Sequence, residues 1–226
     1  MDFDFQIVWG NRALLLEGFY MTIAISALAV PVSIMVGVVI VLMRISKIFA
    51  LKSVAIVYIE IIRNTPFLIQ IFLVFYALPF FGVRLSGIPT GILCLTIYGS
   101  AYFAEIFRGG IESVSRGQVD ASKALGLPYM FYIRKVIFPQ LLGYIIPPGT
   151  NIAITMVKES SLLSMITVAE LTYMAHDLNG RTFSPVEVFA SIAVLYWIIC
   201  NVLIVLSNWL QKRTSFPGQE NTLGIR

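Results

Sequence analysis

The chain has 226 residues, of which 58% are hydrophobic and only 12% charged, and its net charge is +4. Its mean hydropathy is +0.86. An average soluble domain carries roughly 25% charged residues, and a soluble fold of this length has no place for several uncharged runs of about 20 residues. The composition excludes an ordinary soluble protein. A nucleic-acid binder is also excluded, because the basic residues lie between apolar runs.

Five segments are long and apolar enough to cross a bilayer, which takes about 20 residues of helix. They are Phe19–Met43, Val54–Phe81, Ile88–Ala104, Ile137–Val157 and Val188–Leu210. The first is predicted to be retained rather than cleaved, because the residues before it are acidic. A shorter run, Ser160–Ala169, predicts a re-entrant or kinked piece. We therefore predict an all-α polytopic membrane protein with about five transmembrane helices.

Prolines in the second and fourth segments predict interruptions of those two helices. Pro66 predicts a kink in the second segment, where Glu60 and Arg63 are spaced to form an ion pair on one helix face. Pro147 and Pro148 predict that the fourth segment is a broken helix.

The basic residues predict the orientation of the chain in the membrane. Eleven of the 16 Lys and Arg residues fall in the connections at residues 44–53 and 105–136 and in the C-terminal tail, which places those parts in the cytoplasm. Residues 1–18 are then an extracytoplasmic N-terminus, residues 19–210 a transmembrane domain, and residues 211–226 a cytoplasmic tail.

The longest cytoplasmic connection, residues 105–136, predicts a compact helix–turn–helix. Asp120–Leu125 favours a short helix ended by Gly126, and Tyr129–Val136 favours a second one. Such a rigid knob suits docking into a groove of a partner protein. A merely structural connection between spans is the alternative.

This connection resembles the EAA loop of ABC importer permeases, which reads Glu-Ala-Ala, three residues, Gly, nine residues, Ile-x-Leu-Pro. The matching residues are Asp120-Ala121-Ser122, Gly126 and Val136-Ile137-Phe138-Pro139. Asp120, Ser122 and Phe138 are conservative departures from the pattern.

Further stretches resemble the polar amino-acid branch of these permeases. They are Glu60–Pro66, Ala101–Arg108, Gly117-Gln118, Pro139-Gln140, Lys158–Leu162 and Ala169–Leu171. Asn64, Glu159 and Ser160 depart from the usual residues of that branch. The shared order and spacing of these stretches cover most of the chain from Phe19 to Leu210.

The resemblance implies the non-catalytic permease subunit of an ATP-driven importer in a bacterial inner membrane. Its partners would be an ABC ATPase that holds ATP and magnesium, an extracytoplasmic amino-acid-binding protein, and a second permease, identical or related. The chain itself would hold no cofactor, and the sequence contains no GxxxxGK[ST] phosphate loop. The expected ATPase-coupling residues are Arg116, Gly117, Gln118, Asp120, Ala121, Ser122 and Gly126.

Polar residues within the spans predict a substrate cavity, because charges at membrane depth need a partner, water or a ligand. The candidates are Arg63, Asn64, Thr65 and Gln70 on the second span, with Lys158, Glu159, Ser160 and Ser161 after the fourth. A structural ion pair and a Lys158 side chain reaching toward the lipid head groups remain as alternatives. Glu105 and Arg108 are interpreted as interfacial structure, and Glu170 is given no role.

An ion-coupled secondary transporter is the main competing hypothesis. It predicts an inverted repeat with two matching broken helices, and the sequence shows no such repeat. A membrane-embedded enzyme would need a catalytic constellation near the spans, whereas Cys94 and Cys200 fit buried apolar positions and the single histidine, His176, lies in an expected outer loop.

Overall fold

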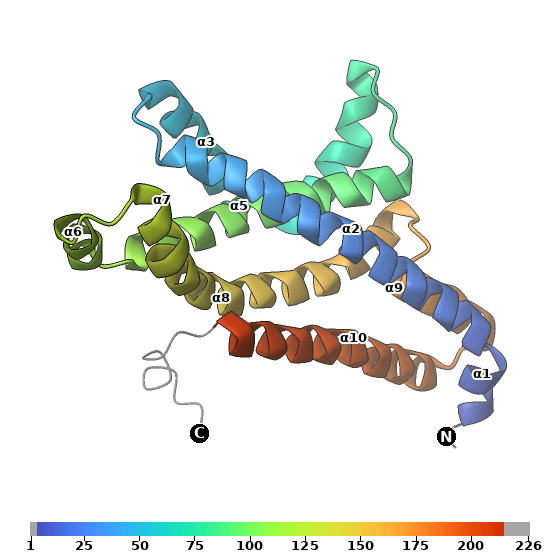
Figure 1. The fold of residues 1–226 in the computed structure, drawn as a ribbon. Coiled ribbons are helices and arrows are strands. Elements are labelled where there is room, and N and C mark those ends of the chain that lie inside the picture. Colours follow the sequence, from blue (N-terminus) through green and yellow to red (C-terminus); the bar gives the residue numbers. More distant parts are fainter. Residues whose placement is uncertain (1–3, 215–226) are drawn as a thin grey trace.

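The computed structural model describes residues 4–214, and within that range every secondary-structure element is a helix and there is no strand (Figure 1). The elements in chain order are α1 (Phe5–Gly10), α2 (Arg12–Arg44), α3 (Phe49–Asn64), α4 (Phe67–Phe72), the π-helical η1 (Leu73–Ala77), the 3₁₀-helical η2 (Leu78–Phe81), α5 (Gly87–Ser113), α6 (Arg116–Ala124), α7 (Tyr129–Tyr132), the π-helical η3 (Ile133–Ile137), α8 (Phe138–Glu159), the 3₁₀-helical η4 (Ser160–Ile166), α9 (Leu171–Thr182) and α10 (Pro185–Thr214). The predicted all-α class is confirmed.

The helices supply the predicted number of membrane crossings. By length and composition α2, α5 and α10 can each cross a membrane alone. Two bent pairs bring the total to as many as five: Phe49–Asn64 with Phe67–Phe81, bent by 110°, and Tyr129–Ile166 with Leu171–Thr182, bent by 51°. The kinked piece expected after the fourth span is confirmed as η4, a 3₁₀ helix at the second bend.

The helix α5 continues beyond Ala104, the last residue predicted for the third span. The sequence placed the start of the cytoplasmic connection at Glu105, but α5 runs on to Ser113. Charges do not end this helix, because Arg108 forms ion pairs with Glu105 and with Glu112, three and four residues away on the same face. The helix that contains the third span therefore extends into the residues predicted to form the cytoplasmic connection.

The fourth span is not broken at its prolines, in contrast to the prediction. α8 runs without interruption through Pro147 and Pro148. Pro139 lies in the first turn of α8, directly after the π-helical η3. Transmembrane helices tolerate interior prolines where the freed carbonyls meet other partners.

Close packing of α2 against α5 forms the centre of the bundle, and small side chains make it possible. Ala29 and Ser33 on α2 have no exposed surface. The Ser33 hydroxyl bonds to the Ala29 carbonyl and lies 3.3 Å from the Leu95 carbonyl across the interface. A methyl group at Gly37 would lie 2.8 Å from the Cβ of Phe103. The two backbones therefore approach too closely for a larger side chain.

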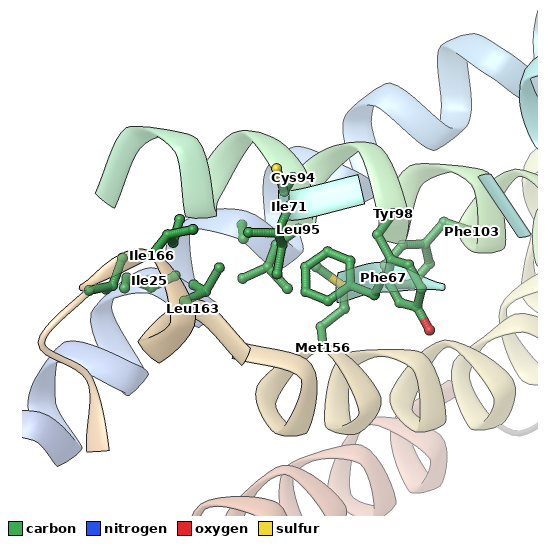
Figure 2. Packing of buried hydrophobic residues seen from close by; sticks show 12 residues of the cluster. Ile25, Phe67, Ile71, Cys94, Leu95, Tyr98, Phe103, Met156, Leu163 and Ile166 are labelled. Atoms are coloured by element: carbon green, nitrogen blue, oxygen red, sulfur yellow. The ribbon is translucent and has the colours of Figure 1, made fainter. Parts of the chain in front are cut away.

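The apolar core joins α2, α4, α5, α8 and η4 (Figure 2). Phe67 and Ile71 belong to it, so the segment after the 110° bend is anchored in the bundle by its first turns. The other labelled members are Ile25, Cys94, Leu95, Tyr98, Phe103, Met156, Leu163 and Ile166.

Glu170, which the sequence left without a role, caps α9 from a fully buried position. Its carboxylate accepts hydrogen bonds from the backbone N–H groups of Thr172 and Tyr173, at 3.0 and 2.8 Å, and from the Tyr196 hydroxyl at 2.8 Å. It thereby fixes the start of α9 against α10. His176 is exposed on α9 rather than in a loop, and its ring lies edge-on to Phe189.

Candidate functional site

The bend of 110° after α3 is the feature from which the site is built. Pro66 has no N–H group, so α3 ends at Asn64 and α4 begins at Phe67. The kink predicted at this proline is confirmed.

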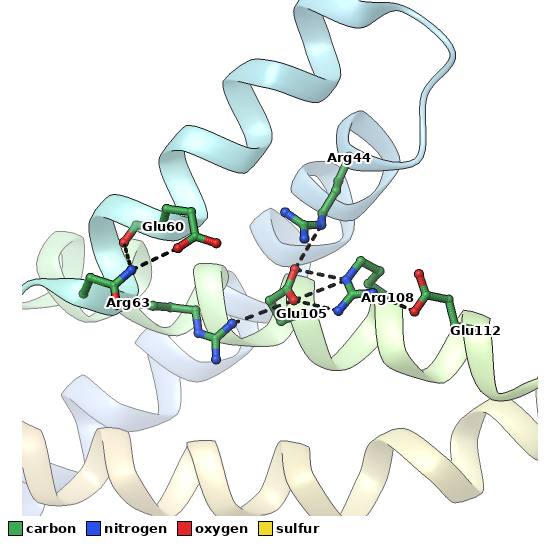
Figure 3. Close-up of polar contacts among 7 residues, drawn as sticks. Arg44, Glu60, Arg63, Glu105, Arg108 and Glu112 are labelled. Carbon is green, nitrogen blue, oxygen red and sulfur yellow. Dashed lines mark hydrogen bonds and ion pairs between the residues drawn. The ribbon is translucent and has the colours of Figure 1, made fainter.

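Side chains beside Pro66 bond to the last carbonyls of α3. Asn64 Nδ2 donates to the Glu60 carbonyl at 2.8 Å and to the Glu60 carboxylate at 3.0 Å. Thr65 Oγ1 donates to the Ile61 carbonyl at 2.7 Å. The predicted Glu60–Arg63 ion pair was wrong, because Glu60 is paired with Asn64 and Arg63 points toward α5 (Figure 3).

Glu105 is the centre of a charge cluster that sequence reasoning missed (Figure 3). Its carboxylate lies 3.1 Å from Arg44 Nε on α2, 3.0 Å from Arg108 Nη2 on α5 and 3.8 Å from Arg63 Nη1 on α3. The side chain of Glu105 is only 16% exposed. The available signal was the need of Arg63, which lies within the second predicted span, for a partner at membrane depth.

A cavity of about 850 Å³ lies between α3, α5 and α8. Its polar lining consists of Arg63, Tyr102, Glu105, Tyr144 and Asn151, and its apolar lining includes Ile106 and Ile152. The Arg63 guanidinium lies 5.3 Å from the centre of the Tyr102 ring, a cation–π distance. Its nearest carboxylate contact is 3.8 Å away and its side chain is 42% exposed, so donors of this guanidinium remain for a ligand.

Two adjacent prolines add acceptors to the same wall. The nitrogens of Pro147 and Pro148 would normally donate to the carbonyls of Gly143 and Tyr144, four residues earlier in α8, and proline cannot donate. All four of these residues line the cavity. The wall opposite Arg63 therefore contains carbonyls that have lost their helical donors.

Of the eight residues predicted to bind substrate, all of them within the described range, Arg63 is the one that lines this cavity. Gln70 is buried and donates to two backbone carbonyls near the bend. The hydroxyls of Ser160 and Ser161 bond back to the carbonyls of Val157 and Lys158. The structure thus does not bring the set around Lys158 and Glu159 together with Arg63 in one cavity.

The predicted helix–turn–helix is confirmed, with a longer first helix, α6, and a second helix that continues through η3 into α8. Gly126 adopts a left-handed backbone with φ of +67°. Its N–H donates to the Lys123 carbonyl at 2.9 Å, and the Leu127 N–H donates to the Ser122 carbonyl at 3.1 Å. These two bonds make a Schellman cap, which needs glycine or asparagine at the left-handed position.

α6 lies at one end of the molecule, beside α7 (Figure 1). Gly117, Gln118, Asp120, Ala121 and Gly126 are exposed, whereas Ser122 is buried and donates to the Gln118 carbonyl. Large apolar side chains are exposed beside the turn, namely Leu125, Tyr129, Met130 and Phe131. Such a patch on a small protruding unit is typical of a protein interaction surface.

Comparison with known proteins identifies the family. A family model described as "Binding-protein-dependent transport system inner membrane component" matches residues 29–216. A probable glutamine ABC transporter permease of Bacillus subtilis (strain 168) is 35% identical over 208 residues, which cover 92% of this chain and 96% of that protein. The glutamine transport system permease of Escherichia coli (strain K12) is 35% identical over 215 residues, which cover 94% and 98%.

A solved structure agrees with these relatives. A chain of an amino acid ABC transporter crystallised with histidines matches the fold with a TM-score of 0.86 and 36% identity, over 94% of this chain and all of that chain. These findings support an ABC importer permease and not an ion-coupled transporter. The chain belongs to the inner-membrane components of binding-protein-dependent transport systems, as a multi-pass permease of the amino-acid ABC importers.

Proposed function

We propose that this chain forms the translocation pathway for a polar amino acid, and that the cavity between α3, α5 and α8 is where the amino acid binds. The observation that carries this proposal is the arrangement of opposite polar groups on facing walls. Arg63 offers donors, while Gly143 and Tyr144 offer carbonyls that prolines have freed.

These two walls match the two charged groups that every α-amino acid carries. The carboxylate pairs with the Arg63 guanidinium, a charge-assisted contact. The ammonium donates to the carbonyls of Gly143 and Tyr144. Glu105 is a poorer partner for the ammonium, because Arg44 and Arg108 already occupy both of its oxygens. Asn151 and the Tyr144 hydroxyl remain for a polar side chain.

The relatives support a polar cargo. Similar relatives include permeases named for glutamine, L-cystine and nopaline. These three compounds all carry polar groups of an α-amino acid. A glutamine-sized molecule fits within 850 Å³. L-Glutamine is therefore a suitable probe for binding to this cavity.

Energy reaches this chain through α6. We propose that a separate ABC ATPase, which holds ATP and magnesium, grips the exposed face of α6 and the apolar patch beside Gly126. The contact residues are Arg116, Gly117, Gln118, Asp120 and Ala121 on α6, with Ser122 and Gly126 fixing its end. This permease then hydrolyses no ATP itself. A binding protein delivers the amino acid at the opposite end, and a second permease, identical or related, completes the pathway.

The orientation follows from the basic residues. α6, the connection after α2 and the end of α10 are rich in Lys and Arg and lie at one end of the molecule (Figure 1). By the positive-inside rule that end is cytoplasmic. Residues 1–18 then lie outside. The tail, residues 211–226, lies inside, although most of it is beyond the described residues.

Replacing Arg63 tests the cavity. Arg63→Gln removes the charge that holds the carboxylate, so binding of radiolabelled L-glutamine to the purified permease–ATPase complex should weaken roughly 10- to 100-fold. Glu60→Gln, three residues away on the same helix but outside the cavity lining, is the matched control and should bind normally. Equal binding by both variants would remove Arg63 from the site.

The turn at Gly126 tests coupling. Gly126→Val forces a β-branched residue into a left-handed backbone and should abolish L-glutamine-stimulated ATP hydrolysis while the permease still inserts. Gly126→Asn should retain most of the stimulation, because asparagine tolerates this conformation. Nothing lies within 4 Å of the added Cβ, so the contrast isolates backbone strain. Wild-type stimulation in the valine variant would separate the turn from coupling.

Labelling across α5 tests the orientation. Ser86 and Ser115 flank this helix of 27 residues, which spans about 40 Å. A cysteine at Ser86 should react with a membrane-impermeant thiol reagent added to whole cells, and a cysteine at Ser115 should react only after the cells are opened. The reverse pattern would invert the topology.

A further inference from the structure

Gln70 lies in α4, just after the bend, and the residue is 8% exposed. Its Nε2 donates to the Ile62 carbonyl at 2.9 Å and to the Thr65 carbonyl at 2.9 Å. These carbonyls belong to the last turn of α3 and to the residue that joins it to α4. One amide group therefore connects the two arms of the bend.

Pro66 explains why this donor is needed. In an unbroken helix the Ile62 carbonyl would accept from the backbone N–H of residue 66, four positions later. Proline has no such N–H, and at membrane depth an unpaired carbonyl is costly. Gln70 supplies the missing donor from the far side of the break.

The two carbonyls also fix which way the amide faces. If the amide were rotated, its oxygen would lie against two carbonyl oxygens, with no proton between them. In the present orientation Oε1 is buried and has no partner within residues 4–214. The orientation is thus set by the demand of the two carbonyls for a donor.

We infer that Gln70 is a positioning residue, which holds the bend at Pro66 and thereby keeps Arg63 on the wall of the cavity. Arg63 follows Ile62 directly, so a carbonyl fixed at Ile62 fixes the turn from which the guanidinium extends. The first turns of α4 are already anchored by Phe67 and Ile71 in the core, so the bond from Gln70 transmits that anchor to α3. The link to binding rests on the role proposed for Arg63, while the link to the bend does not.

Distance measurements test the bend directly. Spin labels at Val54 and Phe80, which are 59% and 89% exposed, lie on opposite arms. They are introduced into the complete transporter after replacement of Cys94 and Cys200 by Ala, with labelled permease diluted by unlabelled permease. Gln70→Leu should broaden or shift the distance distribution that the unsubstituted chain gives. An unchanged distribution would overturn the inference.

Thr65→Val is the matched control at the same break. It removes the Thr65 hydroxyl bond to the Ile61 carbonyl but leaves both bonds from Gln70 intact, so the distance distribution should stay as in the parent. If Gln70→Leu fails to assemble, Gln70→Met replaces it, because the thioether of methionine has a similar length and cannot donate a hydrogen bond. A broadening in Thr65→Val equal to that in the Gln70 variant would also contradict a specific role for Gln70.

A double-mutant cycle identifies the carbonyl on which Gln70 acts. Pro66→Ala allows the helix to continue and its backbone N–H to bond to the Ile62 carbonyl, so Gln70→Leu should lower the thermal midpoint of the complex less in that background than in the parent. Equal decreases in the two backgrounds would show that Gln70 does not serve this carbonyl.

Binding completes the test. Gln70→Leu should weaken binding of radiolabelled L-glutamine roughly tenfold, although Gln70 does not line the cavity. If the distance distribution broadens and binding is unchanged, Gln70 holds the bend but does not position the binding site. If the unsubstituted complex binds no L-glutamine, the proposed binding site is contradicted. The distance distribution still tests whether Gln70 holds the bend.

Discussion

A chain that crosses a bilayer must give every backbone carbonyl a donor, because hydrocarbon offers none. Prolines within the spans break this condition at Pro31 in α2, at Pro66 between α3 and α4, and at Pro147 and Pro148 in α8. At Pro66 the protein restores it from within, through the amide of Gln70. At Pro147 and Pro148 the freed carbonyls belong to residues that line a cavity, and we propose that water or the ammonium of an amino acid supplies the donors. The missing N–H of proline thus accompanies a fixed bend in one span and, in our proposal, provides ligand-binding carbonyls in another.

The charges within the spans obey a similar rule. Glu105 balances arginines from α2, α3 and α5, so the bundle carries its positive charges around one carboxylate rather than singly in lipid (Figure 3). The three contacts are unequal, and that of Arg63 is the longest. This inequality leaves Arg63 as the guanidinium best able to exchange its partner for a ligand, while Arg44 and Arg108 hold the carboxylate in place.

Local chemistry predicted much of this structure from the sequence, and long-range pairing did not. The spans, the kink at Pro66 and the turn at Gly126 follow from hydropathy and from backbone rules for proline and glycine. The ion pair of Arg63 was misassigned because spacing along one helix favours Glu60, whereas the partner that the fold provides comes from α5. Gln70 was interpreted as a substrate ligand because the sequence alone does not show the hydrogen-bond partner of a polar side chain within a span. Its carbonyl partners became visible only with the bend in place.

In the proposed site, the carbonyls freed by Pro147 and Pro148 bind the ammonium of the transported amino acid. This interaction is tested most directly by binding of radiolabelled L-glutamine to the permease–ATPase complex carrying Pro147→Ala and Pro148→Ala. Alanine restores both N–H groups, so binding should weaken about tenfold, while thermal stability stays level or rises. Pro139→Ala, in the first turn of the same helix, is the control and should bind normally. Unchanged binding in the double variant would contradict this interaction.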